Sequence, residues 1–257
     1  MDRLVFITGA SSGIGQALAW RYHQAGWRLA LAARRAAEMA QWARQQGIPP
    51  DRCALYQADV ADTDSIVAAA QDCMARQGLP DVVIANAGIS VGMDTAVRAD
   101  LDVMARVLAT NTVGLAATFH PFVAPMVQRR CGALVGIASV AGIRGLPGHG
   151  AYCASKAAAI SYCESLRGEL RDAGVKVVTI CPGYVATPLT ARNRFPMPFL
   201  MTAEAFADRA FRTIEAGASY RVIPWQMGIA AKLLRVLPNA LLDRAFAGQP
   251  RKRRVGG

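Results

Sequence analysis

The stretch AYCASK, residues 151–156, places Tyr152 and Lys156 four positions apart among small side chains. On a helix, positions i and i+4 are neighbours on one face. A lysine ammonium beside a tyrosine phenol favours the phenolate and therefore lowers the pKa of the tyrosine. Such a pair can donate a proton near neutral pH, but a packing tyrosine and a solvated lysine would leave the same pattern. The secondary structure and the other motifs around the pair are needed to choose between these interpretations.

Short apolar segments alternate with longer helical patterns along the 257 residues. Continuous apolar runs are typical of strands covered on both faces, and strand–helix–strand repetition predicts a parallel sheet. We therefore expect one doubly wound α/β domain over residues 1–223, with a seven-stranded, mainly parallel sheet and helices on both faces, and a C-terminal extension over 224–257. The predicted strands are Leu4–Thr8, Arg28–Ala33, Cys53–Gln57, Val82–Ala85, Ala133–Ala138, Lys176–Cys181 and Tyr220–Ile223, and the predicted helices lie near 14–25, 36–46, 63–77, 100–109, 112–129, 153–173 and 202–216.

The first predicted strand runs into TGASSGIG, residues 8–15, and a helical pattern follows. Glycines at positions 9, 13 and 15 let the backbone turn tightly, and the helix N-terminus offers free amides and a partial positive charge to a phosphate. A strand before and a helix after are the context that a dinucleotide-binding loop requires, although the spacing is GxxxGxG rather than GxGxxG. We expect a dinucleotide here, with an ordinary strand-to-helix turn as the alternative.

The end of the second predicted strand carries Arg34 and Arg35 and no acidic residue. Dinucleotide folds that prefer NAD place an acid here against the ribose 2′-hydroxyl, whereas an arginine suits a 2′-phosphate. A guanidinium can hold a phosphate through two hydrogen bonds. The sequence therefore predicts NADP(H), with Arg34 as the main contact and Arg35 as the second. The alternative is that both arginines only begin a solvated basic helix.

Further motifs follow in order, and together they resemble the classical short-chain dehydrogenases/reductases. The resemblance covers residues 4–188, and one departure is minor: Ala85 precedes Asn86 where many members have a second asparagine. The resemblance implies a Rossmann-type fold and an oxidoreductase that interconverts a carbonyl and a secondary alcohol. The motifs are TGASSGIG at 8–15, ADV at 58–60, NAG at 86–88, Asn111, Ser139, YCASK at 152–156 and PGYVAT at 182–187.

The resemblance also implies roles for single residues. The aspartate and valine of ADV would line the adenine pocket, the NAG segment would stabilise the central sheet and contact the nucleotide, and the PGYVAT segment would hold the nicotinamide end. The implied catalytic tetrad is Asn111, Ser139, Tyr152 and Lys156. The expected cofactor contacts are Gly9, Ser11, Ser12, Gly13, Ile14, Gly15, Arg34, Arg35, Asp59, Val60, Asn86, Ala87, Gly88, Tyr152, Lys156, Pro182, Gly183 and Thr187.

The chemistry of these side chains fits carbonyl reduction. Hydride transfer builds negative charge on the carbonyl oxygen, so a proton must arrive there and donors must stabilise the charge. Tyr152 is the predicted acid; lowering a phenol pKa from about 10 by roughly three units requires about 4 kcal/mol, of which Lys156 would supply a part. Ser139, at the end of its strand, would hydrogen-bond the substrate oxygen. The resemblance implies that Asn111 orients a water joining Lys156 to solvent.

The segment 188–201, after PGYVAT, corresponds to the substrate lid of the family. It contains three prolines and apolar side chains such as Phe195 and Phe199, which form an adaptable apolar surface. We expect a lipophilic carbonyl or alcohol as substrate, although the same residues could simply pack the lid closed. We expect His149 in a loop near the substrate cleft and Cys153 as a packing residue.

Residues 224–246 form a helical pattern with a broad apolar face, and the basic tail Arg251–Arg254 follows. An amphipathic helix with a basic tail can lie on an anionic membrane surface over 224–254. It can equally cover the substrate pocket or form a subunit interface, and all three remain open. Homo-oligomers, dimers or tetramers, are the family norm, and the helices predicted at 112–129 and 153–173 could pair between subunits.

The composition excludes several other classes of protein. With 53% hydrophobic residues, a formal net charge of +11, six cysteines without a CxxC pair and three histidines, we expect reduced, packed cysteines and no metal site. No apolar run approaches the roughly 18 residues that span a bilayer, and no targeting segment is recognised, so a cytoplasmic protein is expected. The basic residues are not interleaved with aromatic ones, so no nucleic-acid partner is expected.

Three other functions fit parts of the sequence. An epimerase or dehydratase of the extended relatives would have a longer C-terminal substrate domain and a different glycine spacing. A nucleotide-binding sensor without turnover would be expected to lose Tyr152 or Lys156, and both are present. A membrane-surface protein would use the segment 224–254. The carbonyl–alcohol oxidoreductase remains the favoured prediction.

Overall fold

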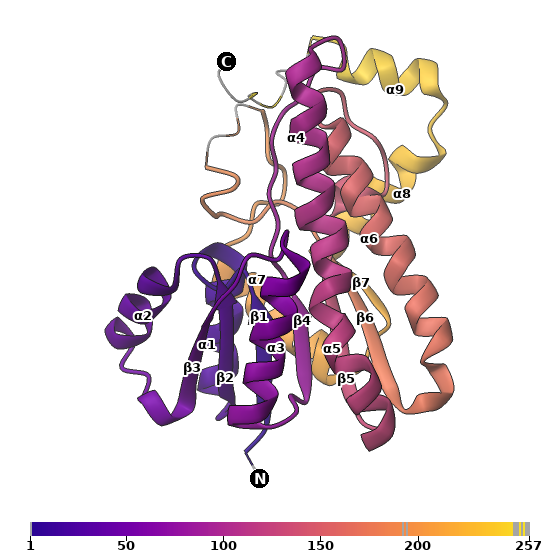
Figure 1. Ribbon diagram of the computed structural model, residues 1–257. Coiled ribbons are helices and arrows are strands. Elements are labelled where there is room, and N and C mark those ends of the chain that lie inside the picture. The colour runs from indigo at the N-terminus through magenta and orange to yellow at the C-terminus, as the bar shows by residue number, and fades with distance from the viewer. Residues whose placement is uncertain (1, 192, 194, 249–251, 253, 255–257) are drawn as a thin grey trace.

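Seven parallel strands form the sheet at the centre of the computed structural model, in the order β3-β2-β1-β4-β5-β6-β7 (Figure 1). The structure describes residues 2–191, 193, 195–248, 252 and 254. The predicted doubly wound sheet is confirmed, and only β5 and β6 differ from the expected bounds, by one residue at each end. The strands are β1 (Leu4–Thr8), β2 (Arg28–Ala33), β3 (Cys53–Gln57), β4 (Val82–Ala85), β5 (Gly132–Ile137), β6 (Val175–Pro182) and β7 (Tyr220–Ile223).

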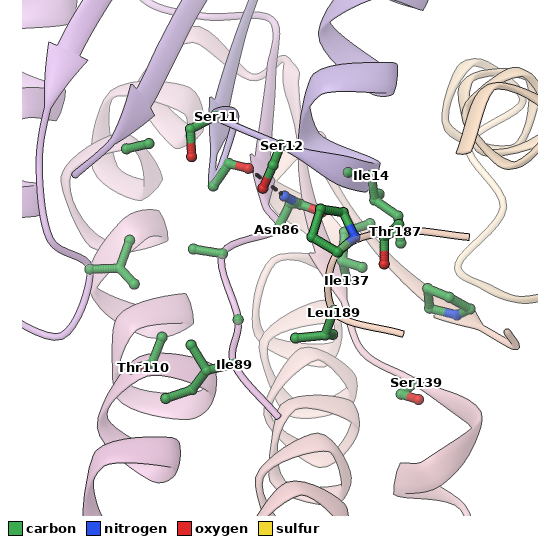
Figure 2. A pocket seen from close by; sticks show the side chains of 18 of the residues that line it. Ser11, Ser12, Ile14, Asn86, Ile89, Thr110, Ile137, Ser139, Thr187 and Leu189 are labelled. Carbon is green, nitrogen blue, oxygen red and sulfur yellow. Dashed lines mark hydrogen bonds between the residues drawn. The ribbon is translucent and has the colours of Figure 1, made fainter. Parts of the chain in front are cut away.

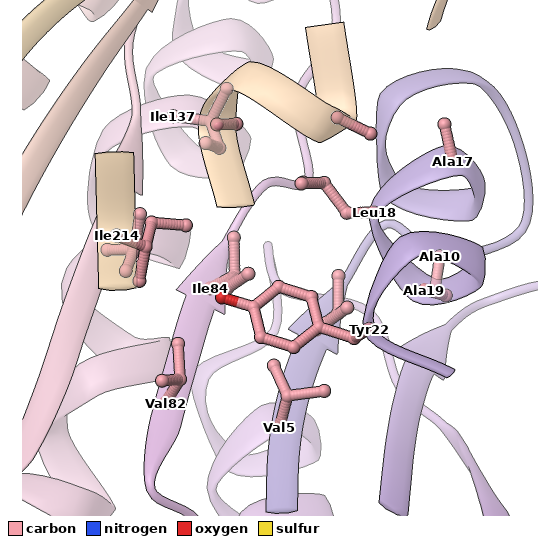
Figure 3. Packing of buried hydrophobic residues seen from close by; sticks show 14 of the residues in the cluster. Val5, Ala10, Ala17, Leu18, Ala19, Tyr22, Val82, Ile84, Ile137 and Ile214 are labelled. Atoms are coloured by element: carbon pink, nitrogen blue, oxygen red, sulfur yellow. The ribbon is translucent and has the colours of Figure 1, made fainter. Parts of the chain in front are cut away.

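Side chains alternate between the two faces of the sheet, and each face has its own apolar core. On β1, Val5 and Ile7 belong to one core cluster and Phe6 to the other. Figure 3 shows the first cluster, where Tyr22 and Leu18 of α1 (Gly13–Gln24) pack against the sheet. Full burial of one such side chain stabilises the fold by about 1.5–3 kcal/mol.

The helices lie in two layers, one on each face (Figure 1). Buried residues of α1, α2 and α7 contribute to the first cluster, and those of α3, α5 and α6 contribute to the second. The sheet is therefore covered on both sides, which explains why its strands read as continuous apolar runs. The further helices are α2 (Ala36–Gln45), α3 (Thr63–Gln77), α4 (Arg98–Leu108), α5 (Gly114–Arg129), α6 (Gly150–Glu169), α7 (Ala203–Glu215), α8 (Trp225–Val236) and α9 (Asn239–Phe246).

The helices predicted at 100–109 and 112–129 are one continuous helix, because a π-helical turn at Ala109–Val113 joins α4 to α5. By length and composition the joined segment Arg98–Arg129 could cross a membrane, which corrects the expectation that no segment is long and apolar enough. Its Phe119 and Phe122 are nevertheless buried against the sheet, as in a core helix. The π turn places Asn111 in the interior, where it is 1% exposed.

The helix predicted over 224–246 is two helices, α8 and α9, with a break at Leu237 and Pro238. Proline has no backbone N–H and pushes the preceding residue out of the helical region. Leu237 accordingly adopts φ −64° and ψ 131°. Two residues of the basic tail, Arg251 and Arg253, lie outside the described residues, whereas Lys252 and Arg254 lie within them.

Candidate active site

The loops that follow the strands surround a cleft of about 420 Å³ at the carboxyl edge of the sheet (Figure 2). It lies at the switch point between β1 and β4, where the order of the strands in the sheet reverses. Open α/β sheets bind their ligands at this place. We call it the nucleotide cleft. Its lining comprises Gly9, Ser11, Ser12, Gly13, Ile14, Ala33, Arg34, Arg35, Ala58, Asp59, Val60, Asn86, Ala87, Gly88, Ile89, Thr110, Ile137, Ala138, Ser139, Tyr152, Lys156, Pro182, Gly183, Val185, Thr187, Pro188, Leu189 and Thr190.

The glycine loop between β1 and α1 is packed too tightly for side chains. Gly9 adopts φ 67°, and a Cβ there would lie 2.8 Å from Cα of Ala87. A Cβ on Gly15 would lie 2.6 Å from Nδ2 of Asn86. Gly15 therefore lies behind the loop and outside the lining of the cleft, where it allows α1 to begin close to β4. Ser12, Gly13 and Ile14 at the start of α1 line the cleft, so the free backbone amides of this first turn border it.

Hydrogen bonds between β1 and the segment after β4 fix the floor of the cleft. The Asn86 amide donates to the Thr8 carbonyl over 2.9 Å, and the backbone amides of Asn86 and Ala87 donate to the Thr8 hydroxyl over 3.1 and 3.2 Å. Thr8 itself is buried. The NAG segment thus holds the two central strands together, as the sequence analysis expects of it.

The two arginines after β2 take different positions. The Arg35 guanidinium donates to the hydroxyls of Ser11 and Ser12 over 3.0 and 3.2 Å, so it lies across the glycine loop. The Arg34 side chain is 68% exposed, and its nearest carboxylate is Asp59 at 3.7 Å. Both arginines line the nucleotide cleft. The cleft therefore presents the Arg35 guanidinium beside its serine hydroxyls and the Arg34 guanidinium beside Asp59, and two such groups suit an additional phosphate group.

Tyr152 lies in the first turn of α6, which begins three residues earlier than predicted. Lys156 lies one turn further and is 4% exposed, and its Nζ donates to the Ile137 carbonyl over 2.8 Å. Its Nζ is 5.9 Å from the centre of the Tyr152 ring. Ser139, just after β5, is buried like Lys156, Tyr152 is half-buried, and all three side chains lie in the wall of the cleft. Three of the four predicted catalytic side chains therefore converge.

The predicted lowering of the Tyr152 pKa is not found in the structure. Burial raises the pKa of Tyr152 to about 12, and the neighbouring Ser139 hydroxyl acts in the opposite direction. Burial lowers the pKa of Lys156 to about 8, because the charged ammonium lies among apolar atoms. Desolvation is the largest effect on the pKa of both groups, whereas a helix-face argument from sequence considers only the attraction between them.

Asn111 lies behind the cleft rather than in its lining. Its amide donates to the Ile89 carbonyl and to the Ser155 hydroxyl, both over 2.9 Å, and its Oδ1 accepts from the Ile89 amide over 2.8 Å. A Cβ on Gly88 would lie 3.3 Å from Oδ1 of Asn111 and 3.4 Å from Nζ of Lys156. Asn111 and Lys156 therefore flank the same glycine, and the water-orienting role of Asn111 stays a prediction.

A second cavity of about 380 Å³ adjoins the nucleotide cleft and shares five lining residues with it, Ser139, Tyr152, Gly183, Leu189 and Thr190. We call it the apolar cavity. Its walls come from the loop after β5, the segment after β6, helix α8 and the C-terminal tail. It is lined by Ser90, Ser139, Val140, Ala141, Arg144, Leu146, Pro147, His149, Tyr152, Gly183, Tyr184, Leu189, Thr190, Asn193, Phe195, Pro196, Pro198, Phe199, Met227, Ala230, Ala231, Leu234, Phe246 and Lys252.

The predicted site residues thus fall into two groups: all except Gly15 and Asn111 line the nucleotide cleft. His149 is the N-cap of α6 and lines the apolar cavity, with its ring 5.5 Å from that of Phe195, and Cys153 is buried. Sequence reasoning missed Thr190, whose hydroxyl donates to the Val185 carbonyl over 2.6 Å. Its spacing of three residues from Thr187 was the available signal.

A family model described as short chain dehydrogenase matches residues 3–196. The chain belongs to the short-chain dehydrogenase/reductase family of oxidoreductases. An uncharacterized oxidoreductase of Myxococcus xanthus is 39% identical over 246 residues, with 95% of this chain and 96% of the relative covered. Dehydrogenase/reductase SDR family member 7B of Bos taurus is 31% identical over 98% of this chain and 83% of its own.

Solved structures share the fold of this family member at low sequence identity. A short-chain dehydrogenase/reductase from Burkholderia phymatum in complex with NAD has a TM-score of 0.82 and 24% identity, with 90% of this chain and 92% of that chain covered. ElxO with NADP bound has a TM-score of 0.79 and 22% identity, with 87% and 97% covered. The fold is therefore one that holds either nicotinamide cofactor in other proteins.

Proposed function

We propose that this protein is an NADP(H)-dependent oxidoreductase that interconverts an apolar carbonyl compound and the corresponding secondary alcohol. The observation that carries the proposal is the position of Ser139 and Tyr152, which belong to both the nucleotide cleft and the apolar cavity. A hydroxyl and a phenol lie where a cofactor and an apolar substrate would meet. Carbonyl chemistry needs its proton donor and its oxygen-binding group at that place.

The nucleotide cleft fits a dinucleotide with a 2′-phosphate. The first turn of α1 and the close approach of Gly9 to Ala87 leave room for a pyrophosphate. Arg34 and Arg35 would hold the 2′-phosphate, and Asp59 and Val60 would line the adenine pocket. Pro182, Gly183 and Thr187 would hold the nicotinamide end. When bound, the cofactor supplies or accepts the hydride.

The protein's own side chains would manage the oxygen and the proton. Ser139 would donate a hydrogen bond to the substrate oxygen, and Tyr152 would give a proton to that oxygen in reduction and take one in oxidation. Lys156, held by the Ile137 carbonyl, would favour the phenolate that remains on Tyr152. Burial raises the pKa of Tyr152 to about 12, so the phenol that would donate in reduction is protonated at neutral pH.

The first test is NADPH oxidation against ketones and aldehydes from small polar to long-chain and steroid-like, with NADH in parallel. Tyr152→Phe removes the proton donor, and we expect kcat to fall by about 10²–10⁴-fold. The NADPH affinity of the variant, measured by fluorescence, should change little. Turnover with NADH but not with NADPH would overturn the assignment of NADP(H) and leave the carbonyl chemistry standing.

A sensor that binds NADP(H) without turnover is the alternative function. It would show tight NADPH binding, no turnover on any carbonyl and no effect of Tyr152→Phe beyond a small change in affinity. Ser139 argues against it, because its hydroxyl lies where the nucleotide cleft meets the apolar cavity and it is not among the expected cofactor contacts.

We also propose that this is a cytoplasmic protein whose α8 meets an anionic membrane surface. One face of α8 lines the apolar cavity, and the opposite face exposes Trp225, Ile229, Leu233 and Val236, the last at 78%. An apolar stripe of this kind marks a contact surface. The exposed Lys232 and Arg235 flank it. A two-fold contact with a second copy would bring equal charges together, whereas an anionic surface would neutralise them.

Sedimentation with vesicles tests this contact. Wild-type protein should sediment with vesicles that contain phosphatidylserine and not with neutral ones, and Leu233→Glu should abolish the effect. A Leu233→Glu variant that still sediments would overturn the proposal. A homo-oligomer is proposed on family grounds alone; light scattering of the wild type and of Leu233→Glu measures it and shows whether the stripe is instead a subunit contact.

A further inference from the structure

The tail residue Lys252 lies in the wall of the apolar cavity, although most other lining residues are far from it in sequence. Its Nζ donates to the Leu189 carbonyl over 3.1 Å and to Oδ1 of Asn193 over 2.7 Å. Both partners belong to the segment after β6 and line the same cavity. Lys252 is therefore a fixed part of the cavity rather than a solvated lysine of a basic tail.

A half-buried ion pair, in which Asp100 is buried and the Arg254 side chain is 38% exposed, holds the same stretch of tail on its other side. Nε of Arg254 lies 2.6 Å from Oδ2 of Asp100, and Nη2 lies 3.2 Å from Oδ1, so the pair has two parallel contacts. Asp100, on α4, is 3% exposed and also accepts from the Asp94 amide over 2.7 Å. Such a pair is geometrically specific. It keeps Lys252, two residues earlier, at the cavity.

The charges around the apolar cavity are unbalanced. Among its described lining residues there is no aspartate or glutamate, but there are two strong cations, Arg144 and Lys252. Arg144 is held by neutral oxygens, among them Oδ1 of Asn239 at 2.7 Å. Burial lowers the pKa of Lys252, which indicates that its positive charge lacks compensation there. Burial likewise lowers the pKa of His149, and the charge of Lys252 adds to this.

We propose that the apolar cavity takes carbonyl and alcohol substrates that carry a carboxylate, and that the Lys252 ammonium binds this carboxylate. The inference rests on the proposed function and narrows its substrate class. An ammonium has three N–H groups, and among the residues that the structure describes Leu189 and Asn193 accept two of them, which leaves one for a ligand. One remaining donor suits a singly charged carboxylate better than a phosphate dianion, which calls for several donors. The rest of the cavity would hold the apolar body of the molecule.

Binding of decanoate and decanamide, measured by calorimetry with the full chain and saturating NADP⁺, tests the proposal without any turnover. The two probes share their apolar body and differ in charge. Wild-type protein should bind decanoate at least about tenfold more tightly, the ratio expected for a hydrogen bond to a charged group. Lys252→Gln should remove this preference and leave decanamide affinity unchanged. Lys252→Arg should keep it.

Two matched variants locate the effect. Lys232→Gln removes an exposed lysine from the outer face of α8 and should leave the preference intact. Leu234→Trp narrows the cavity and should weaken both probes. Equal affinity of the two probes for the wild type, or an equal loss of both in Lys252→Gln, would overturn the proposal and make Lys252 a tail anchor only. If the wild type prefers decanoate to decanamide but oxidises NADPH with none of the carbonyl compounds, the result would instead contradict the proposed function.

Discussion

The nucleotide cleft and the apolar cavity meet at Ser139 and Tyr152, but they are built in different ways. Backbone at the ends of parallel strands forms the cleft, held by hydrogen bonds such as those between Thr8 and Asn86. Side chains from segments far apart in sequence form the cavity, including α8 and the tail residue Lys252. In the proposed function, cofactor binding would therefore depend mainly on backbone geometry, and substrate binding would depend on side chains that can change without disturbing the sheet.

The largest effect should come from Gly15→Ala on the cleft side. The new Cβ would lie 2.6 Å from Nδ2 of Asn86, and relieving such an overlap costs about 3 kcal/mol. We expect the loop to relieve this strain by shifting out of its phosphate-binding position. If NADPH binding loses the same free energy, the NADPH dissociation constant rises by roughly 100-fold. Fluorescence titration measures it.

Gly168→Ala is the control for that substitution. Gly168 is exposed on α6, and an added Cβ would meet no atom within 4 Å. Alanine in an exposed helix stabilises by about 0.5–1 kcal/mol relative to glycine. Unchanged NADPH affinity in Gly15→Ala would show that the cleft is not a rigid backbone site.

The second effect concerns the choice of cofactor. Arg34→Glu replaces an exposed cation of the cleft with an anion, and we expect the ratio of kcat/KM for NADPH to that for NADH to fall by about tenfold, or about 1.4 kcal/mol. Solvent around Arg34 limits the effect. Arg44→Glu makes the same charge change on an exposed part of α2 and should leave the ratio unchanged. If the ratio of kcat/KM for NADPH to that for NADH stays constant in Arg34→Glu, the assignment of the 2′-phosphate to Arg34 is wrong and Arg35 becomes the candidate contact.

A smaller effect is expected on the cavity side. Leu234→Trp fills part of the apolar cavity, so KM for a bulky ketone should rise by about fivefold while NADPH affinity stays unchanged. Leu233→Trp adds the same volume on the outer face of α8, where Leu233 is 63% exposed, and should change neither constant. A loss of NADPH affinity in Leu234→Trp would mean that the two sites are coupled more closely than their construction indicates.

The smallest effect should come from the tail. Hydrogen bonding to Arg254 lowers the pKa of Asp100, so the pair stabilises the protein at neutral pH and this contribution is lost as the pH falls below about 3.8 and through the lowered value. Arg254→Gln should lower Tm by about 2 °C at pH 7, and the difference should persist to about pH 4 and shrink as the pH falls below about 3.8. Arg98→Gln breaks an exposed pair on the same helix and should not change Tm. A difference that persists well below pH 3.8 would exclude the ion pair as its cause.

Much of the fold and of the cleft could be predicted because both depend on local patterns. Apolar runs bounded by glycine and polar residues set the ends of β1 to β4, and the glycine loop has to lie at the end of β1. The bounds of α4 and α5 were missed because a π turn changes one hydrogen bond and leaves the apolar pattern intact. Pro238 was a signal for the break between α8 and α9. The apolar face that continues across it favoured one long helix instead.

The sequence by itself determined the order of the motifs, the parallel sheet and the family, because these follow from patterns within a few residues. Only the tertiary structure decided how the groups behave. Burial raises the pKa of Tyr152 where neighbours on the helix suggested the reverse. Arg35 lies across the glycine loop, and α8 divides its apolar residues between a cavity and the outer surface. Desolvation and contacts between distant segments depend on the whole chain, so no local pattern contains them.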